Sequence, residues 1–529
     1  MDLKTLVVLV PNYRGKPSSL APLKEMLRQK TTLKNALWLE FTYAESLCSN
    51  KDPEIIAQSL SDTIDNYVYD HRDQVDQIIL AGHSMGASIL RRAYLNASGF
   101  GRSTALSKSW ANLVCRLVLM GGFGRGFVIN NQSLILKYSL SILAFTARTF
   151  GFGKMLLAML AGSDFISRLR VDWLHMSTSG RNVPQVVHLL GSADLAIRPE
   201  DVIDLDQFPN AVPVGVSGVS HSAIARPNQQ TENPLKRAFL GEAVANRGVK
   251  VTGSAKKVFF FLHGIRDSRD CFKKVSDELS RRYPEAKMVL PHYGYLSARG
   301  FLNTRYRNSF VSWFIDEYAE YLARNPKTEF YFAGHSNGTY ILGEALQRIP
   351  RLSFERLYLA ASVLPPKYDW DTAINDRQQA KSVRSDMGSQ DWSVGVLCRV
   401  LNKFGWKDIG TGGFDGFEFG DTDHIAYHRF TGGHGAMLKE GNTTSIVDFL
   451  LSSSSAKLDS REVGRPSKIF VTFVKYGDIL LPIGLLLLLA IVLVLATLPL
   501  TWPSLAWHDF GPPMAALIVA VLWIVMGRF

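Results

Sequence analysis

Two serines in this sequence lie in the same short motif. Ser84 and Ser336 are each the third residue of Gly-His-Ser-x-Gly, at residues 82–86 and 334–338. Each motif follows an apolar run typical of a buried strand and precedes an amphipathic pattern typical of a helix. Because glycines flank each serine, the chain can turn sharply from strand to helix and expose the side chain at the tip. We therefore interpret both serines as nucleophiles.

A serine hydroxyl is a weak nucleophile at neutral pH, so it needs a base, and the base needs a carboxylate that orients it. In the first half of the chain, Asp194 follows an apolar run, and His221 lies in a loop of small residues. In the second half, Asp391 follows Gly-Ser-Gln, and His434 lies between glycines. Both halves therefore supply serine, aspartate and histidine in the same order along the chain.

Other carboxylates could take the role of the acid. Asp201 and Asp204 are alternatives to Asp194. Asp386 is the alternative to Asp391, although it falls within or at the end of an apolar strand pattern.

The remaining histidines of interest have structural interpretations. His83 and His335 precede the two serines, and we expect them to support the turn. His188 falls in a strand pattern. His424 and His428 are four residues apart, but isoleucine follows the first of them where a zinc-binding motif of this spacing has glutamate, so the sequence predicts no metal site.

The elements that must position these side chains alternate between apolar strands and helices, which predicts an α/β fold with a mostly parallel sheet and helices on both faces. In the first half we expect strands at 5–10, 36–41, 116–120 and 185–190, and helices at 18–29, 52–69 and 234–245.

Residues 122–180 interrupt this alternation with helical patterns at 132–147 and 154–169. We expect a helical cap above the carboxyl edge of the sheet, where open α/β folds bind ligands. Its apolar character favours an acyl or lipid substrate, although a helix that only packs on the body would also be apolar.

The second half repeats the plan of the first, beginning with an apolar strand at 258–262. This repetition predicts two tandem domains, and the apolar C-terminal region described below predicts a membrane anchor. The expected boundaries are 1–246 for the first domain, 247–257 for a linker, 258–450 for the second domain, 451–476 for a tether and 477–529 for the anchor.

Composition narrows the class of protein further. The net charge is +12, but no basic block is interleaved with aromatic residues, so we expect no nucleic-acid partner. A basic surface facing anionic lipid would explain the charge, which could equally have no specific meaning. The four cysteines are scattered, which favours a reducing compartment and indicates neither disulfides nor a zinc site.

The C-terminal region suggests a membrane hairpin. Residues 479–500 carry no charge and are numerous enough to cross a bilayer as a helix. A shorter apolar run at 510–527 could either span or lie in the interface. Lys and Arg precede the first run and follow the second but are absent between them, which predicts that both domains face the cytoplasm.

Both halves, over about residues 1–450, resemble α/β-hydrolase-fold serine hydrolases, the relatives of esterases, lipases and thioesterases. The resemblance implies acyl transfer through an acyl-serine intermediate. We therefore expect cleavage of an ester or thioester, and labelling of both Ser84 and Ser336 by a fluorophosphonate probe. It implies that histidine acts as base and then acid, that aspartate orients it, and that no metal or organic cofactor takes part.

The resemblance also implies backbone donors for the oxyanion. Phe261-Leu-His-Gly-Ile265 resembles the family's His-Gly loop, so the N–H groups of Ile265 and Asn337 would hold the oxygen. The first half has Val-Pro-Asn-Tyr instead, and there we expect Asn12 or Tyr13 together with Met85.

Two alternative functions remain compatible with the sequence. One domain, more readily the first with its altered loop, could be a non-catalytic binding or scaffold module at the membrane. The same triad could also serve lyase or transferase chemistry.

Overall fold

The computed structural model describes most of the chain. The described residues are 4–43, 49–101, 107–122, 124–127, 134–177, 179, 183–194, 210–243, 255–264, 271–290, 303–418, 424–452, 461–462 and 464–501. By internal contacts the chain divides into two compact units, one with residues 1–254 and 315–327 and the other with 255–314 and 328–529.

The first unit contains a sheet of six parallel strands in the order β2-β1-β3-β4-β5-β6. These strands are rich in Val, Ile and Leu and largely buried, as expected for a parallel sheet covered on both faces. Strand order reverses between β1 and β3, which is the kind of switch point where such sheets bind ligands. The strands are β1 (Thr5–Val10), β2 (Leu37–Glu40), β3 (Gln77–His83), β4 (Val114–Met120), β5 (Gln185–Gly191) and β6 (Ala211–Val216).

The second unit contains a seven-stranded parallel sheet in the order β13-β12-β11-β10-β9-β7-β8. Apart from the added β13, this order repeats that of the first sheet, with β9 in the place of β3. The strands are β7 (Lys257–Leu262), β8 (Lys287–Val289), β9 (Glu329–His335), β10 (Arg356–Ala360), β11 (Val383–Gly388), β12 (Ile425–Phe430) and β13 (Arg461–Glu462).

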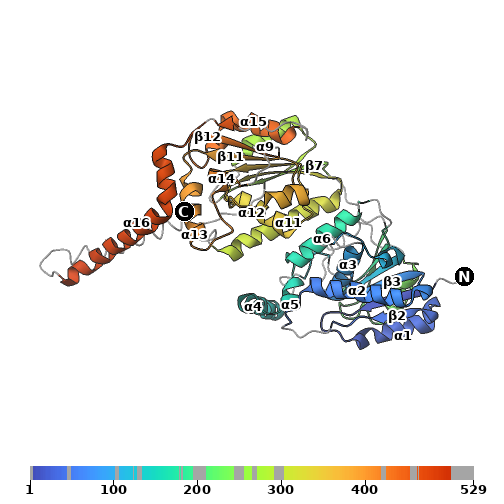
Figure 1. Cartoon of the computed structure of the whole chain (residues 1–529). Coiled ribbons are helices and arrows are strands. Elements are labelled where there is room, and N and C mark those ends of the chain that lie inside the picture. Colours follow the sequence, from blue (N-terminus) through green and yellow to red (C-terminus); the bar gives the residue numbers. More distant parts are fainter. Residues whose placement is uncertain are drawn as a thin grey trace. The chain divides into compact units, whose positions relative to one another are not determined.

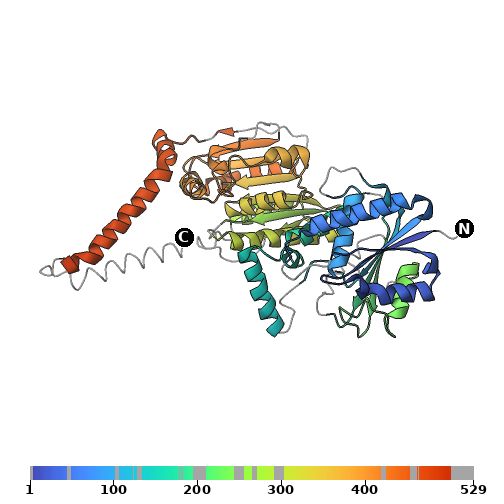
Figure 2. The same cartoon turned by 60° about the horizontal axis from the view of Figure 1, so that its bottom comes forward.

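Helices cover both faces of the first sheet (Figures 1 and 2). Apolar residues of α1 and α8 form one core cluster with the strands, while α2 packs on α3 on the other face. This confirms the predicted α/β class. The helices of this unit are α1 (Ala21–Lys30), α2 (Pro53–Asp70), α3 (Met85–Ala97), α4 (Leu134–Phe150), α5 (Lys154–Ala158), α6 (Asp164–Ser177) and α8 (Glu232–Leu240).

The core of the second unit is aromatic. Phe314 of α11 packs against Phe260 and Phe332 of the sheet, with ring centroids 5.2 and 5.6 Å apart. The helices are α9 (Lys273–Arg282), α11 (Thr304–Arg324), α12 (Asn337–Arg348), α13 (Arg399–Lys403), α14 (Gly412–Asp415), α15 (Thr443–Leu451) and α16 (Lys468–Thr501). Residues 315–327 of the chain, which include the end of α11, group with the first unit.

The insertion between β4 and β5 is helical as expected, but the prediction of one continuous helix at 154–169 is wrong. It breaks between α5 and α6, where Gly162 has a φ of 72° and Leu160 bridges Phe127. In addition, α6 packs on α3 of the body: Asp172 accepts a hydrogen bond from the buried Arg92. Part of the expected cap therefore belongs to the layer of helices that covers the first sheet.

The segment expected to be a tether, 451–476, contains regular structure. It contributes β13 to the edge of the second sheet and the start of α16. The first turns of α16 pack on residues 393–414, where Phe470 meets Phe414 at 5.8 Å between ring centroids and Val474 is buried. Apolar contacts thus order residues that the polar composition marked as a linker.

The stretch predicted to cross a membrane at 479–500 lies within α16. In the described part of the chain, no helix qualifies as long and apolar enough to cross a bilayer. The second predicted run, at 510–527, lies outside the described residues.

Candidate active site

Both serines stand at the turn between a central strand and the helix that follows it. Ser84 has φ 55° and ψ −124°, and Ser336 has φ 53° and ψ −119°. Residues other than glycine rarely adopt such angles, which cost about 1–3 kcal/mol and cluster at functional sites. Hydrogen bonds hold the turns, because each serine N–H donates to the end of the neighbouring strand, at Met120 O and Ala360 O, both at 3.0 Å.

Glycine is required two positions after each serine. A Cβ on Gly86 would lie 2.2 Å from Pro11 O, and one on Gly338 would lie 2.2 Å from Leu262 O. The first turn of the helix therefore packs directly against the end of β1 or β7. This contact brings the loop after that strand beside the serine.

In the first unit the three predicted residues meet. His221 Nε2 lies 2.9 Å from Ser84 Oγ, and His221 Nδ1 lies 2.7 Å from Asp194 Oδ2. Because a carboxylate only accepts, Nδ1 carries the proton and Nε2 is free to accept the serine proton. Ser84 and Asp194 are buried, so little water competes for these bonds.

The loops after β5 and β6 set this geometry. Ala193 donates its N–H to Val219 O at 3.1 Å, which ties the loop of the aspartate to that of the histidine. Gly121, with a φ of 57°, lies against the His221 ring, since a Cβ there would be 3.3 Å from Nδ1. The alternatives Asp201 and Asp204 lie outside the described residues.

In the second unit only two of the three predicted residues are joined. His434 Nδ1 lies 2.8 Å from Asp391 Oδ2, and Asp391 Oδ1 accepts the N–H of Val394 at 3.0 Å. Within the described residues, Ser336 Oγ has no hydrogen bond to His434. The two sites therefore differ at the contact that activates a serine.

Asp386, the alternative acid, is engaged elsewhere. Arg384 donates to both of its oxygens at 2.8 Å, and the hydroxyl of Tyr358 donates at 2.9 Å. Asn442 adds a hydrogen bond at 3.1 Å. Because these donors occupy the carboxylate of a fully buried residue, the geometry favours Asp391 as the partner of the histidine.

The loops expected to supply oxyanion donors are only partly described. After β1 the chain turns tightly, with Gly15 N–H donating to Asn12 O at 2.7 Å. Tyr43, whose pKa is raised above its usual range by burial, donates its hydroxyl to Pro11 O at 2.8 Å. Tyr13 belongs to this loop, and its oxyanion role, like that of Asn12, stays a prediction.

On the helix side, Met85 and Asn337 are the first residues of α3 and α12. The N–H groups there have no acceptor within the helix, so they are available to an anion. In the second unit Gly264 lies against the nucleophile, since a Cβ on it would be 2.8 Å from Ser336 Cβ. Ile265 lies outside the described residues.

Two histidines beside the first site are neutral. His83 Nε2 lies 3.0 Å from the carbonyl oxygen of His221, and burial lowers the pKa of His83 to about 4. His188, in β5 as expected, has its Nε2 3.0 Å from Gly122 O, and burial and nearby Arg91 lower its pKa to about 4. The sequence predicted that His83 supports the turn, but it did not reveal the contact with His221.

Within the described residues, no group of three or more His, Cys, Asp or Glu side chains could hold a metal ion. In β12, His428 Nδ1 lies 3.7 Å from Asp386 Oδ1.

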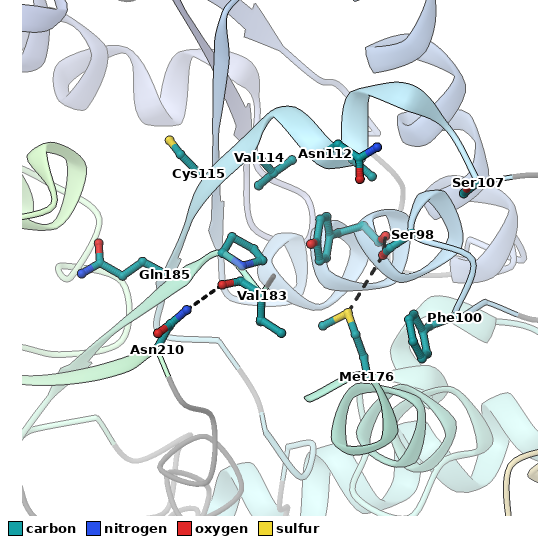
Figure 3. A pocket seen from close by; sticks show the side chains of 13 residues that line it. Ser98, Phe100, Ser107, Asn112, Val114, Cys115, Met176, Val183, Gln185 and Asn210 are labelled. Carbon is teal, nitrogen blue, oxygen red and sulfur yellow. Dashed lines mark hydrogen bonds between the residues drawn. The ribbon is translucent and has the colours of Figure 1, made fainter. Parts of the chain in front are cut away.

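The first unit also contains a cavity of about 790 Å³. It is lined by residues at or just before the starts of β4, β5 and β6, namely Val114, Gln185 and Asn210 (Figure 3). Two of the lining residues are hydrogen-bonded to each other, since Asn210 donates to Val183 O at 2.7 Å. The serine, aspartate and histidine instead follow the ends of their strands, so this cavity lies at the opposite edge of the sheet.

Fold and site together define an α/β protein with a serine-histidine-aspartate arrangement. No family model matches the sequence. No curated protein matches it either.

Among solved structures, one of two esterases from Rhizomucor miehei is 13% identical over 45% of this chain and 74% of its own, with a TM-score of 0.32. The monoacylglycerol lipase of Paleococcus ferrophilus is 13% identical over 45% of this chain and 92% of its own, with a TM-score of 0.30. Phospholipase PlaB of Legionella pneumophila is 15% identical, with a TM-score of 0.24, and the match spans only 38% of that protein. Similarity this low carries no argument about activity.

Proposed function

We propose that the first unit is a serine hydrolase that cleaves an ester or thioester. The observation that carries the proposal is the pair of contacts from His221 to Ser84 and Asp194, at 2.9 and 2.7 Å. The strained turn at the serine and its place at the switch point of the sheet support the same chemistry.

In the proposed mechanism, Ser84 Oγ attacks the substrate carbonyl while His221 Nε2 takes the hydroxyl proton. The tetrahedral oxygen is held by the N–H of Met85 and by that of Asn12 or Tyr13. As the intermediate collapses, the histidine gives its proton to the leaving oxygen or sulfur. Water then attacks the acyl-serine with the histidine as base, and Asp194 stabilises the imidazolium in both steps.

We further propose a lipid-like acyl substrate. The support is the surface of α4, where Tyr138, Ile142 and Phe145 are exposed at a spacing that places them on one face of the helix. Phe150 at the end of the helix is exposed as well. An apolar face on the insertion fits a substrate that is delivered from a membrane or micelle.

A fluorophosphonate probe tests the proposal for the first unit. We expect covalent labelling at Ser84, located by mass spectrometry of the labelled peptide, and loss of that label in Ser84→Ala. A screen of acyl esters and thioesters should show turnover that disappears in the same variant. Hydrolysis that persists in Ser84→Ala at the wild-type rate, in a chain that also carries Ser336→Ala, would exclude both serines.

A second proposal concerns the second unit, which we infer to be the weaker catalyst or a binding module. The sequence favoured the first unit for that role, because of its altered loop. The missing hydrogen bond between Ser336 and His434 within the described residues favours the reverse. We expect Ser336→Ala to leave ester turnover unchanged, whereas a large loss of turnover would show that the second site is active.

We also propose that residues 477–529 attach the chain to a membrane with both units in the cytoplasm. The uncharged stretch at 479–500 and the distribution of Lys and Arg around it support this. Carbonate extraction should leave the full chain in the membrane fraction and release a chain ending at residue 478. Protease should cleave the two units in vesicles whose cytoplasmic side faces outward. In sealed vesicles of the opposite orientation the two units should be protected.

A further inference from the structure

We propose that His83 and His335 are positioning residues, each of which fixes the main chain of the histidine in its own site. This inference rests on the proposed function. In each unit the histidine before the serine extends its Nε2 to the carbonyl oxygen of the site histidine. The distances are 3.0 Å from His83 to His221 O and 3.0 Å from His335 to His434 O.

The repetition is informative because the surrounding loops differ. The loop of His221 contains serine, valine and alanine, whereas that of His434 consists largely of glycine. The two units also differ in the residue after the serine, Met85 in one and Asn337 in the other. A contact that recurs at the same length in these different surroundings indicates a common requirement of the site.

The chemistry of the contact assigns the proton. A carbonyl oxygen only accepts hydrogen bonds, so Nε2 of His83 and of His335 must donate. Each ring therefore carries a hydrogen on Nε2. In the first unit, the bond ties the end of β3, directly before the serine, to the loop of the base, which is 138 residues further along the chain.

Neutrality explains why histidine, and not lysine or arginine, stands at this position. The rings of His83 and His221 lie 5.6 Å apart between centroids. When His221 takes the serine proton it becomes a cation, and a second cation at this distance would oppose that step. Burial lowers the pKa of His83 to about 4, so at neutral pH it donates a hydrogen bond without adding charge.

Two substitutions of His83 distinguish the effect of its N–H donor from the effect of its size. In His83→Gln the side-chain amide can take the place of Nε2, whereas in His83→Asn the shorter side chain brings its amide only as far as Nδ1. We expect His83→Asn to lower the rate of Ser84 labelling by about 10- to 100-fold, because misplacement by about 1 Å costs on this order. We expect His83→Gln to recover most of the wild-type rate. With an ester substrate, kcat should fall in His83→Asn while KM stays nearly constant.

A matched control is available in the same unit. His71 also has a ring nitrogen on a main-chain carbonyl, Tyr67 O at 2.9 Å, but at the C-terminal end of α2, away from the site. His71→Asn should leave Ser84 labelling unchanged. Thermal unfolding of all variants shows whether they are folded. If His83→Asn does not fold, His83→Leu keeps much of the bulk of the ring without a donor and should show the same deficit in Ser84 labelling.

The outcomes distinguish this inference from the proposed function. Equal labelling rates at Ser84 in wild type, His83→Gln and His83→Asn would overturn the positioning role and leave the hydrolase proposal intact. A wild-type chain that is not labelled at Ser84 at all would overturn the proposed function itself. A deficit in His83→Asn that His83→Gln restores supports the inference.

Discussion

At the scale of single residues, the first site depends on the state of one imidazole. Asp194 fixes the proton of His221 on Nδ1 and thereby leaves Nε2 as the acceptor for Ser84. The asparagine of Asp194→Asn can donate to Nδ1 and so favours the wrong tautomer. We expect the ester kcat to fall by on the order of 10³–10⁴ with substrate binding little changed. Steady-state kinetics measures both, and a loss below tenfold would indicate another acid, with Asp201→Asn and Asp204→Asn as the next variants.

A second residue-scale prediction concerns Asn337. Its side chain is fully buried, and neither its amide oxygen nor its amide nitrogen has a hydrogen-bond partner among the residues that the structure describes. Met85, equally buried, holds the same position in the first unit. Because an unpaired buried polar group costs about 1–3 kcal/mol, we expect Asn337→Met to stabilise the second unit by an amount of this order.

Calorimetry of the full chain measures this change as an upward shift of the transition of the second unit. The main-chain N–H expected to serve the oxyanion is unaffected by the substitution. A lower transition temperature would mean that the amide is paired in solution, for example by a bound ligand.

At the scale of elements, α6 is fixed to α3 by a buried ion pair. Arg92 is fully buried and donates to Asp172 of α6 and to Glu54 of α2, the latter at 2.7 Å. Asp172→Ala would leave the guanidinium with one carboxylate, and we expect a destabilisation of about 3 kcal/mol, since breaking a buried pair costs 3–5 kcal/mol. Urea unfolding of the first unit measures it.

An exposed pair provides the control. Lys108 contacts Asp62, whose side chain is 51% exposed. Lys108→Ala should cost about 1 kcal/mol or less. Similar losses in Asp172→Ala and Lys108→Ala would contradict the view that α6 is part of the folded body.

Patterns of apolar residues and glycines predicted much of this structure. The strand, glycine and serine at 77–86 are local signals, so the turn at Ser84 could be predicted, and the order of serine, aspartate and histidine pointed to the residues that meet in the first site. At the break between α5 and α6, Leu160 forms an isolated bridge with Phe127, which is distant in sequence, and β13 pairs with the edge of the second sheet. Tertiary contacts of this kind leave no periodic signal in the sequence.

The same limit applies to the second site. Its loop matched the family pattern better than that of the first unit, yet Ser336 and His434 are not hydrogen-bonded in the described structure. Whether two side chains meet depends on tertiary packing, which a sequence pattern does not show. The hydrogen bonds of His83 and His335 are equally invisible in sequence, although the repeated histidine before each serine was a signal that they share a role.

At the scale of the whole molecule, two buried histidines make the stability of the first unit depend on pH. Burial lowers the pKa of His83 and of His188 from 6.5 to about 4 each. Between these values the unfolded chain binds the protons and the folded chain does not, so the free energy of unfolding falls as pH falls from 6.5 to 4. Each histidine contributes a loss of about 3 kcal/mol across this range, at about 1.4 kcal/mol per pH unit.

Urea unfolding between pH 7 and pH 4, with hydrogen exchange in β3 reporting on the first unit, measures this slope. His188→Gln removes one of the two titrating groups. It should therefore remove about half of the loss of unfolding free energy that the two histidines cause on acidification, although Gln itself lowers the stability at pH 7. His71→Asn, at the end of α2, should leave the slope close to that of wild type. Other groups also bind protons in this range, so the comparison between variants carries the test, and equal slopes in wild type and His188→Gln would show that His188 is not held neutral by the fold.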